Sequence, residues 1–401
     1  MSSTAPTPRI ALAVGCTSHI VQDGLTAATY VLMPVLAQTF GFAYAQVGLI
    51  KGLKSLSQAA LEIYSGVLTE RIGEGRTLVF GLVLSGIGYA LLAFAPDPAL
   101  VMACLLIVGA GTAFQHSPSS ALVSMAYEGG GRRGALGLYN SSGDVGKLGF
   151  SGFFSLAIGA GFAWQQISFS FGLITLLTAA GVAVTTRYFK TRSTLVTKHS
   201  SESEPGDDLG WGILSWRSFG TLLLIIALDN VVQAGVMVFI AFLMIAKGLP
   251  LAIATMATVV LLTGGVFGKA GCGYLAEHIG VRPAFALVQA LTALGLVLVV
   301  AAPAWLAFIL LLPLGVVTQG STSITYGLIP DLIHPRRMAR GYAVMYSSTS
   351  FAAAFGPWMF GLIGDRFGIS VAMLAMAVVA VLAVPPLAFL PAFKEVKGRP
   401  L

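Results

Sequence analysis

The chain has 401 residues, of which 56% are hydrophobic and only 10% are charged, and its mean hydropathy is +0.86. Soluble globular domains carry about 25% charged residues, so this composition excludes a soluble fold of this length. Only helices or closed barrels span a bilayer, and the apolar segments here are long and continuous rather than short alternating strands. The composition therefore predicts an all-α membrane protein. The formal net charge of +7 acquires its meaning from the positions of the basic residues.

Twelve apolar segments of membrane-spanning length follow one another along the chain, since about 20 apolar residues cross a bilayer core. We expect helical crossings at residues 10–36, 45–69, 77–95, 99–126, 134–160, 164–188, 217–246, 250–275, 283–302, 304–330, 339–363 and 369–391. The first segment is too long for the hydrophobic part of a cleaved signal peptide, so we interpret it as a membrane helix.

A polar stretch with four acidic residues, from Lys190 to Ser215, separates the sixth crossing from the seventh. Such a composition is typical of a flexible linker. We therefore expect an N-terminal six-helix bundle at residues 1–189, a cytoplasmic linker at 190–215 and a C-terminal six-helix bundle at 216–401.

The basic residues are distributed unevenly between the two sides of the membrane. Most of the 23 Lys and Arg residues lie in the linker, near the two ends of the chain and in the connections on the same side, whereas the opposite connections hold Lys247 and Arg366. Cytoplasmic loops carry the excess of Lys and Arg, so we expect both termini in the cytoplasm and the protein in a bacterial inner membrane. The positive charge is then a topology signal, and no nucleic-acid partner is expected.

Signals for an enzyme or a cofactor are weak. Cys16, Cys104 and Cys272 lie in apolar segments without metal-like spacing, and no nucleophile–base set or phosphate-binding loop of the ATPase type stands out. His19 and Asp23 have helical metal-ligand spacing, but no third ligand is near in sequence. We predict no enzyme, no cofactor and no metal site.

The two halves of the chain repeat each other. The segment Gly66–Gly73 matches Gly273–Gly280 at an offset of 207, and Gly111–Ser117 matches Gly315–Ser321 at an offset of 204. Two parallel six-helix halves with a substrate site between them, near the bilayer midplane, are the organisation of transporters of the major facilitator superfamily. We therefore predict the major facilitator fold, with two pseudo-symmetric six-helix bundles.

The loop after the second crossing resembles the cytoplasmic signature loop of that superfamily, and a degenerate copy follows the eighth crossing. The resemblance implies a cytoplasmic gate held by acid–arginine pairs and tight glycine turns; an ordinary charged loop is the alternative. Glu62 and Lys269 occupy equivalent positions in the two halves, where static pairing is favoured over substrate contact. The residues predicted for the gate are Glu62, Gly66, Glu70, Arg71, Gly73, Arg76, Lys269 and Glu277.

Three stretches, at residues 18–50, 109–120 and 129–146, resemble the fosmidomycin-resistance-type drug exporters. That resemblance implies proton-driven efflux of a small compound. The sequence departs from that group at His116-Ser-Pro118, where serines follow instead of an acid, and at Asp144, where that group has an Asn.

Charged residues within the crossings are the most informative feature, because each costs about 2.5–3.5 kcal/mol at a helix centre. They fall on crossings 1, 2, 5, 7 and 8, with histidines on 1 and 4, and avoid crossings 3, 6, 9 and 12, which face lipid in the superfamily. A poorly solvated carboxylate suits proton coupling, for which we predict Asp23, Asp229 and His19. The residues predicted for substrate binding are Lys54, His116, Asn140, Asp144, Lys147, Gln233 and Gln319.

The sequence thus favours a proton-coupled exporter of a small drug-like or organic-anion compound. Lys51, Lys54, Lys147 and Lys269 within the crossings favour an anionic substrate. An importer of an organic anion and a non-transporting membrane receptor are the alternatives, and Asp144 and Lys147 alternatively only neutralise each other. The expected partners are the substrate, protons and the lipid bilayer, and we expect a monomer.

Overall fold

The computed structural model describes residues 8–127, 131–188, 211–326, 328–334 and 338–390. Apart from an isolated bridge between Ile213 and Ile333, regular structure in these residues is helical. Both ends of the chain and most of the predicted linker at 190–215 lie outside the described residues.

The chain forms two compact units. The N-terminal unit comprises residues 1–207 and 250–259, and the C-terminal unit comprises residues 208–249 and 260–401. The expected bundles at 1–189 and 216–401 remain a prediction, and the compact units depart from them at the start of the eighth crossing.

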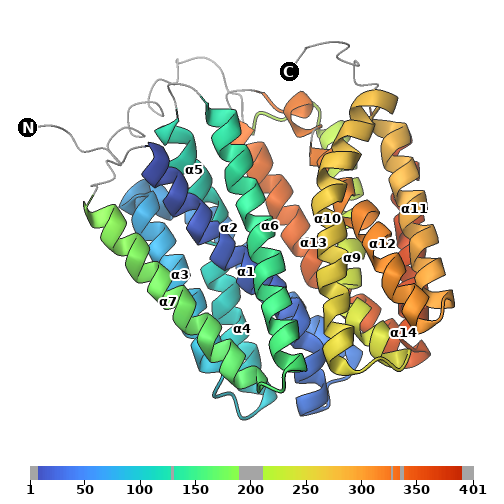
Figure 1. The fold of residues 1–401 in the computed structure, drawn as a ribbon. Coiled ribbons are helices and arrows are strands. Elements are labelled where there is room, and N and C mark those ends of the chain that lie inside the picture. Colours follow the sequence, from blue (N-terminus) through green and yellow to red (C-terminus); the bar gives the residue numbers. More distant parts are fainter. Residues whose placement is uncertain (1–7, 128–130, 189–210, 327, 335–337, 391–401) are drawn as a thin grey trace, which may run out of the picture. The chain divides into compact units, whose positions relative to one another are not determined.

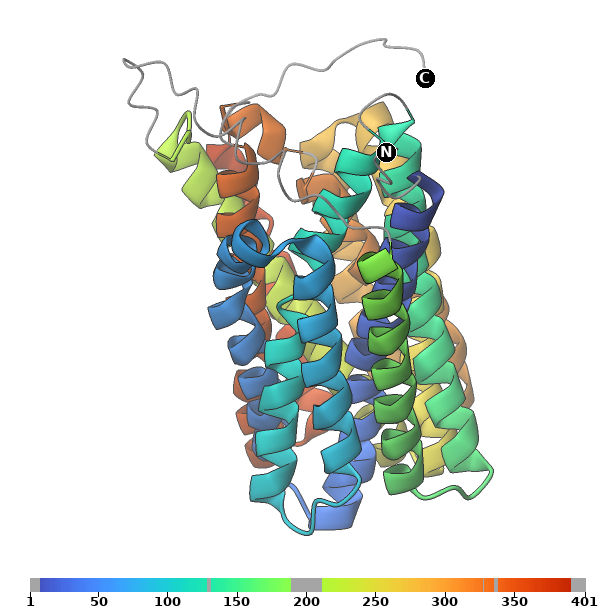
Figure 2. The ribbon, with the colours of Figure 1, turned by 90° about the vertical axis from the view of Figure 1, so that its left-hand side faces the viewer.

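The N-terminal unit is a bundle of long helices in which α1 packs against α6 and α3 packs against α7. Figures 1 and 2 show these helices running side by side. Their bounds are α1 (Pro8–Phe40), α2 (Tyr44–Ile72), α3 (Glu74–Leu92), α4 (Pro98–Thr112), α5 (His116–Ala126), α6 (Arg132–Gly159) and α7 (Trp164–Tyr188). Asp97 caps α4 by accepting from the Leu100 amide at 3.0 Å, with Pro98 at the first helical position.

In the C-terminal unit, α11 packs against α12 and α14, and α9 packs against α13. The elements are α9 (Trp216–Ala246), α10 (Leu251–Ile279), α11 (Val281–Ala301), α12 (Ala304–Tyr326), η2 (Ile329–Leu332), α13 (Met338–Phe367), α14 (Ile369–Leu382) and η4 (Pro385–Phe389). The first turns of α10 belong to the N-terminal unit.

The helices follow the predicted crossings with two corrections. The twelfth crossing, expected over 369–391, ends as an α-helix at Leu382 and continues as the 3-10 helix η4. The fourth crossing, expected as one helix over 99–126, consists of α4 and α5 with a break at residues 113–115. Pro118 has no amide hydrogen to give to the carbonyl four residues earlier, and the Phe114 amide bonds back to Gly111 in a tighter turn. His116 consequently stands at the first turn of a helix instead of its middle.

Nine described helical segments are long and apolar enough to cross a membrane. The long helices α2, α6 and α13 fall outside that group, because polar residues such as Lys51 on α2 and Lys147 on α6 interrupt their apolar runs. These interruptions coincide with charged positions that the sequence marks as functional.

The repeat between the two halves is visible in the backbone. Gly73, between α2 and α3, has φ 89° and ψ 156°, and Gly280, between α10 and α11, has φ 88° and ψ 154°. Only glycine adopts this conformation without strain, so the turn itself requires the glycine of each repeat.

Candidate functional site

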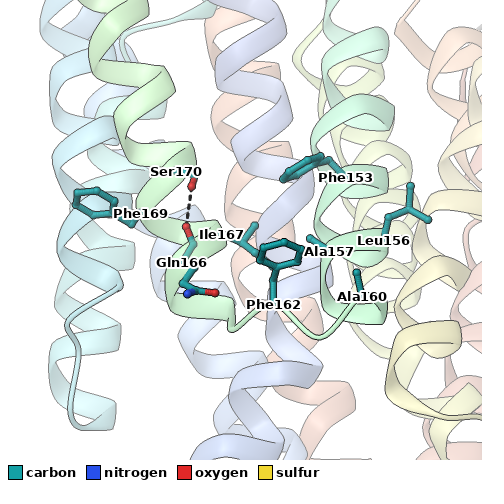
Figure 3. A pocket seen from close by; sticks show the side chains of 9 residues that line it. All are labelled: Phe153, Leu156, Ala157, Ala160, Phe162, Gln166, Ile167, Phe169 and Ser170. Atoms are coloured by element: carbon teal, nitrogen blue, oxygen red, sulfur yellow. Dashed lines mark hydrogen bonds between the residues drawn. The ribbon is translucent and has the colours of Figure 1, made fainter.

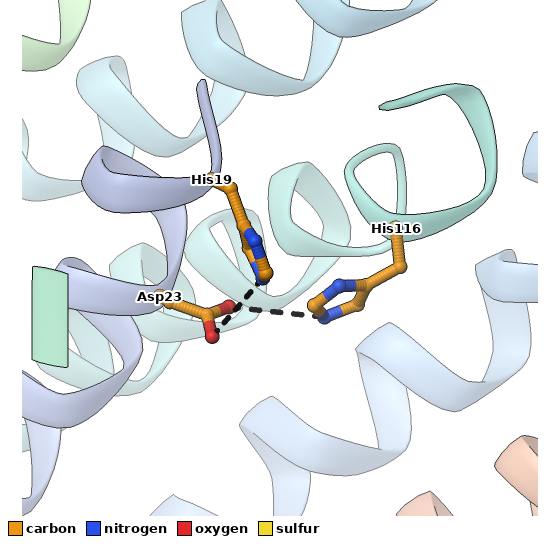
Figure 4. Close-up of side chains that lie close together, drawn as sticks. All are labelled: His19, Asp23 and His116. Carbon is orange, nitrogen blue, oxygen red and sulfur yellow. Dashed lines mark ion pairs between the residues drawn. The ribbon is translucent and has the colours of Figure 1, made fainter. Parts of the chain in front are cut away.

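Asp23 on α1 is the buried centre of a charged cluster in the N-terminal unit, whose outer members His116 and Lys147 are partly exposed. Asp23 is 6% exposed, and three nitrogen-bearing side chains surround its carboxylate. His19 Nε2 lies 3.3 Å from Oδ2, His116 Nε2 lies 3.8 Å from Oδ1, and Lys147 Nζ lies 3.1 Å from Oδ2. Figure 4 shows both imidazoles directed at this carboxylate. Asp23 is therefore well compensated as a charged group.

Two glycines on α6 bring the partners of Asp23 close to α1. A Cβ at Gly146 would collide with the backbone of Ile20, and a Cβ at Gly143 would lie 2.7 Å from the His19 ring and 2.8 Å from Asp23 Oδ2. Both contacts are closer than a side chain tolerates. The absence of side chains at these positions lets Lys147 reach Asp23 from the neighbouring helix.

The orientation of His19 fixes the position of one ring proton. Its Nδ1 lies 2.9 Å from the Tyr139 carbonyl oxygen, which only accepts, so Nδ1 carries the hydrogen. The Tyr139 ring stacks on the imidazole with centroids 4.3 Å apart. Nε2 then faces the carboxylate of Asp23, and this contact is a hydrogen bond only when Nε2 also holds a proton. The His19–Asp23 contact therefore depends on whether Nε2 carries a hydrogen.

Lys147 connects two acids. Its ammonium lies 3.1 Å from Asp23 and 3.2 Å from Asp144 Oδ1, one turn earlier on α6. The half-buried Asp144 is thus within reach of the same cation. Asn140, which lies four residues earlier on α6 and was also predicted to bind substrate, is exposed. Asp144 and Lys147 do form an ion pair, as in the alternative that they only neutralise each other. Lys147 also pairs with Asp23, so it does more than neutralise Asp144.

Two lysines of α2 are buried beside hydroxyl and aromatic groups. Lys54, 1% exposed, donates to Thr26 Oγ1 at 3.5 Å. Lys51 donates to Ser55 Oγ at 3.3 Å and lies 4.4 Å from the centre of the Tyr30 ring. Neither lysine forms an ion pair with an acid among the described residues. A buried ammonium without an ion-pair partner is costly, although Asp23 lies close enough to act electrostatically on Lys54.

The structure supplies a third possible metal ligand beside His19 and Asp23, where the sequence shows none nearby. His116, remote in sequence, joins His19 and Asp23, and ligand atoms of the three residues lie within 4.8 Å of one another. The set has the chemistry of a transition-metal site. The ammonium of Lys147 at 3.1 Å already supplies a positive charge to the same carboxylate, which makes this carboxylate a poor ligand for a cation.

In the C-terminal unit the second predicted carboxylate, Asp229 on α9, is 3% exposed and held by neutral donors. Gln233 Nε2 donates to its Oδ2 at 2.8 Å, Gln289 Nε2 donates to its Oδ1 at 2.7 Å, and Ser321 Oγ lies 2.9 Å from both oxygens. Gln233 was predicted from the sequence as a site residue, whereas Gln289 and Ser321 were not. The sequence signal for Gln289 is its position as the one amide side chain in the apolar helix α11.

For most of the predicted gate residues and for Gln319, the structure gives the exposure of the side chain, which by itself indicates no role. Arg71, Arg76 and Glu277 are exposed, whereas Glu62, Gly66, Lys269 and Gln319 are half-buried. The side chain of Glu70 lies outside the described residues. The gate assignment stays a prediction, as does substrate contact by Gln319.

A pocket of about 710 Å³ lies where α6 ends and α7 begins. Its lining is aromatic and aliphatic, including Phe153, Phe162 and Ile167, with Gln166 and Ser170 as the polar members (Figure 3). None of the predicted site residues lines it, so we keep it apart from the charged cluster.

Membrane-length helices that carry charged clusters indicate a multi-pass membrane protein, and comparison with known proteins supplies the family. The model of the Major Facilitator Superfamily matches residues 16–271 and 222–400, so the chain belongs to that superfamily. Its members are transporters, and the protein is accordingly not an enzyme.

Curated relatives match over limited stretches. The tetracycline resistance protein, class G, of Vibrio anguillarum is 33% identical over 132 residues, which are 32% of this chain and 34% of the relative. The multidrug resistance protein MdtH of Proteus mirabilis is 32% identical over 124 residues, 29% and 31% of the two chains. YfnC of Bacillus subtilis, an uncharacterised transporter of the superfamily, is 28% identical over 130 residues, 32% and 31%. The matches thus span about a third of each relative.

Solved structures agree over nearly the whole chain. A bacterial homolog of the human lysosomal transporter Spinster, crystallised in an inward-facing and occupied conformation, has a TM-score of 0.78 at 17% identity, with 96% of both chains covered. A point mutant of the nucleoside transporter NupG has a TM-score of 0.72 at 11% identity, covering 95% of this chain and 98% of NupG. At such identities the likeness establishes the fold, which is the major facilitator fold predicted from the sequence.

Proposed function

We propose that this protein is a proton-coupled exporter of small drug-like or organic-anion compounds, working by alternating access in a bacterial inner membrane with both termini cytoplasmic. The observation that carries the proposal is the cluster in which the buried Asp23 carboxylate faces His19, His116 and Lys147. A carboxylate and an imidazole that share a proton inside a helix bundle are equipped to take up and release it as access alternates.

Two kinds of comparison support drug export. The tetracycline and multidrug resistance proteins among the relatives are named for resistance, and three segments of the N-terminal half resemble fosmidomycin-resistance-type exporters. The sequence has no recognisable ATP-binding motif, so we infer that an ion gradient supplies the energy for transport.

The buried lysines support an anionic substrate. Lys51 and Lys54 have hydroxyl and aromatic partners rather than acids among the described residues, while Lys147 is shared between Asp23 and Asp144. An anionic group that enters near Lys54 would gain the charge pairing that the protein leaves open. We propose Lys54, His116 and Lys147 as substrate-binding residues, and Asn140, Asp144, Gln233 and Gln319 as the other members of the predicted set.

Purified protein in proteoliposomes tests the proposal, with radiolabelled tetracycline and fosmidomycin as the first probes and a thermal-shift screen of organic anions to extend the panel. An imposed proton gradient should drive at least one probe uphill, and a protonophore should abolish that accumulation. Asp23→Asn should lose uphill transport but keep exchange of probe. Asp144→Asn, which leaves the Lys147–Asp23 pair, should keep proton-driven uphill transport and change only the apparent affinity for the probe. Wild-type accumulation that survives the protonophore would refute proton coupling.

The importer alternative rests on the same lysines, because an anion site serves either direction. Everted membrane vesicles separate the two: an exporter accumulates the probe in them, and an importer depletes it. The receptor alternative gains no support, since the family and the solved neighbours are transporters.

A further inference from the structure

The hydroxyl of Ser321 on α12 has more than one acceptor within reach. Its Oγ lies 2.9 Å from each carboxylate oxygen of Asp229 and 3.1 Å from the Thr318 carbonyl oxygen of its own helix. A serine hydroxyl holds one hydrogen and two lone pairs, so it donates to one acceptor at a time while its oxygen remains free to accept. The group can therefore take two orientations without losing its own hydrogen bond.

The amide of Gln233 serves both orientations. Its Nε2 donates to Asp229 Oδ2 at 2.8 Å and to Ser321 Oγ at 3.1 Å, and Gln289 donates to Asp229 Oδ1 at 2.7 Å from α11. These two amides donate to different oxygens, and both bonds are compatible with a protonated Asp229, because the carbonyl oxygen accepts from one amide and the hydroxyl oxygen keeps a lone pair for the other. The group that must change with the charge of Asp229 is Ser321.

We propose that Asp229, Ser321 and the Thr318 carbonyl form a two-state proton-binding site inside the C-terminal unit. With Asp229 charged, the Ser321 hydroxyl donates to the carboxylate. With a proton on Asp229, the carboxyl O–H donates to Ser321 Oγ, and the Ser321 hydroxyl turns to the Thr318 carbonyl. The Ser321 hydroxyl hydrogen and, when present, the Asp229 carboxyl proton have an acceptor in both states. The inference deepens the proposed proton coupling and rests on it for its physiological meaning.

The charges around Asp229 distinguish this site from Asp23. No ion pair joins Asp229 to a cation in the part of the chain that the structure describes, and its hydrogen-bond partners on α9, α11 and α12 are neutral. The other titratable group found to interact with it is the Cys272 thiol of α10, which donates to the Val316 carbonyl at 3.8 Å. A neutral Asp229 therefore strands no counter-ion, whereas a neutral Asp23 would leave the Lys147 ammonium with Asp144 alone.

Ser321 is thus a positioning residue, and infrared spectroscopy of the full-length protein in lipid nanodiscs tests its role without substrate or gradient. The C=O stretch of a protonated carboxyl should appear as the pH falls, move on labelling with ¹³C-carboxyl aspartate, and vanish in Asp229→Asn. Asp229→Glu, with its band at a shifted frequency, replaces that variant if the asparagine protein fails to fold.

Ser321→Ala should change this band in two ways. Its frequency should rise, because the carboxyl O–H loses its acceptor. Its midpoint should move to higher pH, by about half to one unit, because the charge-assisted bond lost by the ionised form is the stronger of the two. Ser321→Thr, which keeps a hydroxyl, should restore wild-type behaviour.

Thr318→Val is the matched control. Thr318 is buried on the same helix one turn away, and its hydroxyl donates to the Leu314 carbonyl at 2.8 Å. Removing it should leave both frequency and midpoint unchanged. The proposal is overturned if Ser321→Ala behaves like Thr318→Val, or if the folded protein shows no Asp229-dependent band at any pH. A titrating Asp229 in a protein whose transport ignores the proton gradient would instead refute the proposed function and leave this site intact.

Discussion

The ammonium of Lys147 lies 3.1 Å from Asp23 Oδ2, across the interface between α1 and α6. Its second contact, 3.2 Å to Asp144, stays within α6. The cross-helix contact therefore ties the proposed proton site on α1 to a helix that carries a predicted substrate residue. Any event that draws Lys147 away from Asp23, such as the arrival of an anion, changes the charge balance at His19 and Asp23.

Lys147→Gln should destabilise the protein by about 3 kcal/mol, because among the described residues it leaves the buried Asp23 carboxylate paired with the two histidines and no permanent cation. The double variant Lys147→Gln with Asp23→Asn should recover much of that loss, since both charges are removed together. Thermal unfolding in detergent, run as a double-mutant cycle, measures the coupling. If the stability losses of the two single variants simply add up in the double variant, the contact contributes no coupling energy.

Gly143→Ala should abolish uphill transport while preserving the fold. The added methyl would lie 2.7 Å from the His19 ring and 2.8 Å from Asp23 Oδ2, so the pair must separate. Gly149→Ala is the control on the same helix, where a Cβ meets nothing within 4 Å. Transport of a probe in proteoliposomes compares the two. Similar activity in both variants would mean that the close approach of α6 to α1 is unimportant.

Lys54→Gln should weaken binding of an anionic probe and at the same time raise the melting temperature, because it removes a buried ammonium that has Thr26 as its hydrogen-bond partner. A stability gain with a functional loss is the signature of a charge kept for ligand binding. Thermal shift with and without the anion provides both numbers. Unchanged affinity would remove Lys54 from the substrate site.

Much of this arrangement could be read from the sequence, because it depends on spacing within single helices. The four-residue interval between His19 and Asp23 and the three-residue interval between Asp144 and Lys147 place each pair on one helix face, and both pairs form contacts. The repeat with Gly73 and Gly280 likewise corresponds to equivalent turns.

What could not be predicted are the contacts between helices. His116 reaches Asp23 because the fourth crossing breaks before it, and Lys147 does so because Gly143 and Gly146 admit α1. Helix rotation and separation decide such contacts, and a single sequence does not give them. Gln289 was not predicted for a different reason. It is a neutral amide, whereas the prediction rested on ionisable residues, and its contact with Asp229 joins two separate helices, α11 and α9.

Arg76→Ala tests the predicted gate. If the exposed Arg76 after the Gly73 turn holds the cytoplasmic side closed, losing a contact of about 1 kcal/mol should slow turnover about fivefold with little change in affinity. Arg187→Ala, an exposed arginine in the last turn of α7, controls for surface charge. Identical turnover in wild type and Arg76→Ala would reduce the loop to a connection.

The proton shared by His19 and Asp23 leads to the last prediction. His19→Gln should abolish accumulation of probe against its gradient yet retain exchange between equal pools, because the lysines proposed to bind substrate are untouched. The loss follows from geometry: an amide at this position can donate a hydrogen bond but cannot take up and release a proton as the imidazole does. Tyr139→Phe keeps both the backbone carbonyl that accepts from Nδ1 and the ring stacked on the imidazole, so it should couple normally. Uphill transport and exchange are measured in the same proteoliposomes, with the proton gradient imposed in one series and collapsed in the other. If His19→Gln still concentrates the probe when the gradient is present, the pair does not carry the coupled proton, and the Asp229 site becomes the remaining candidate.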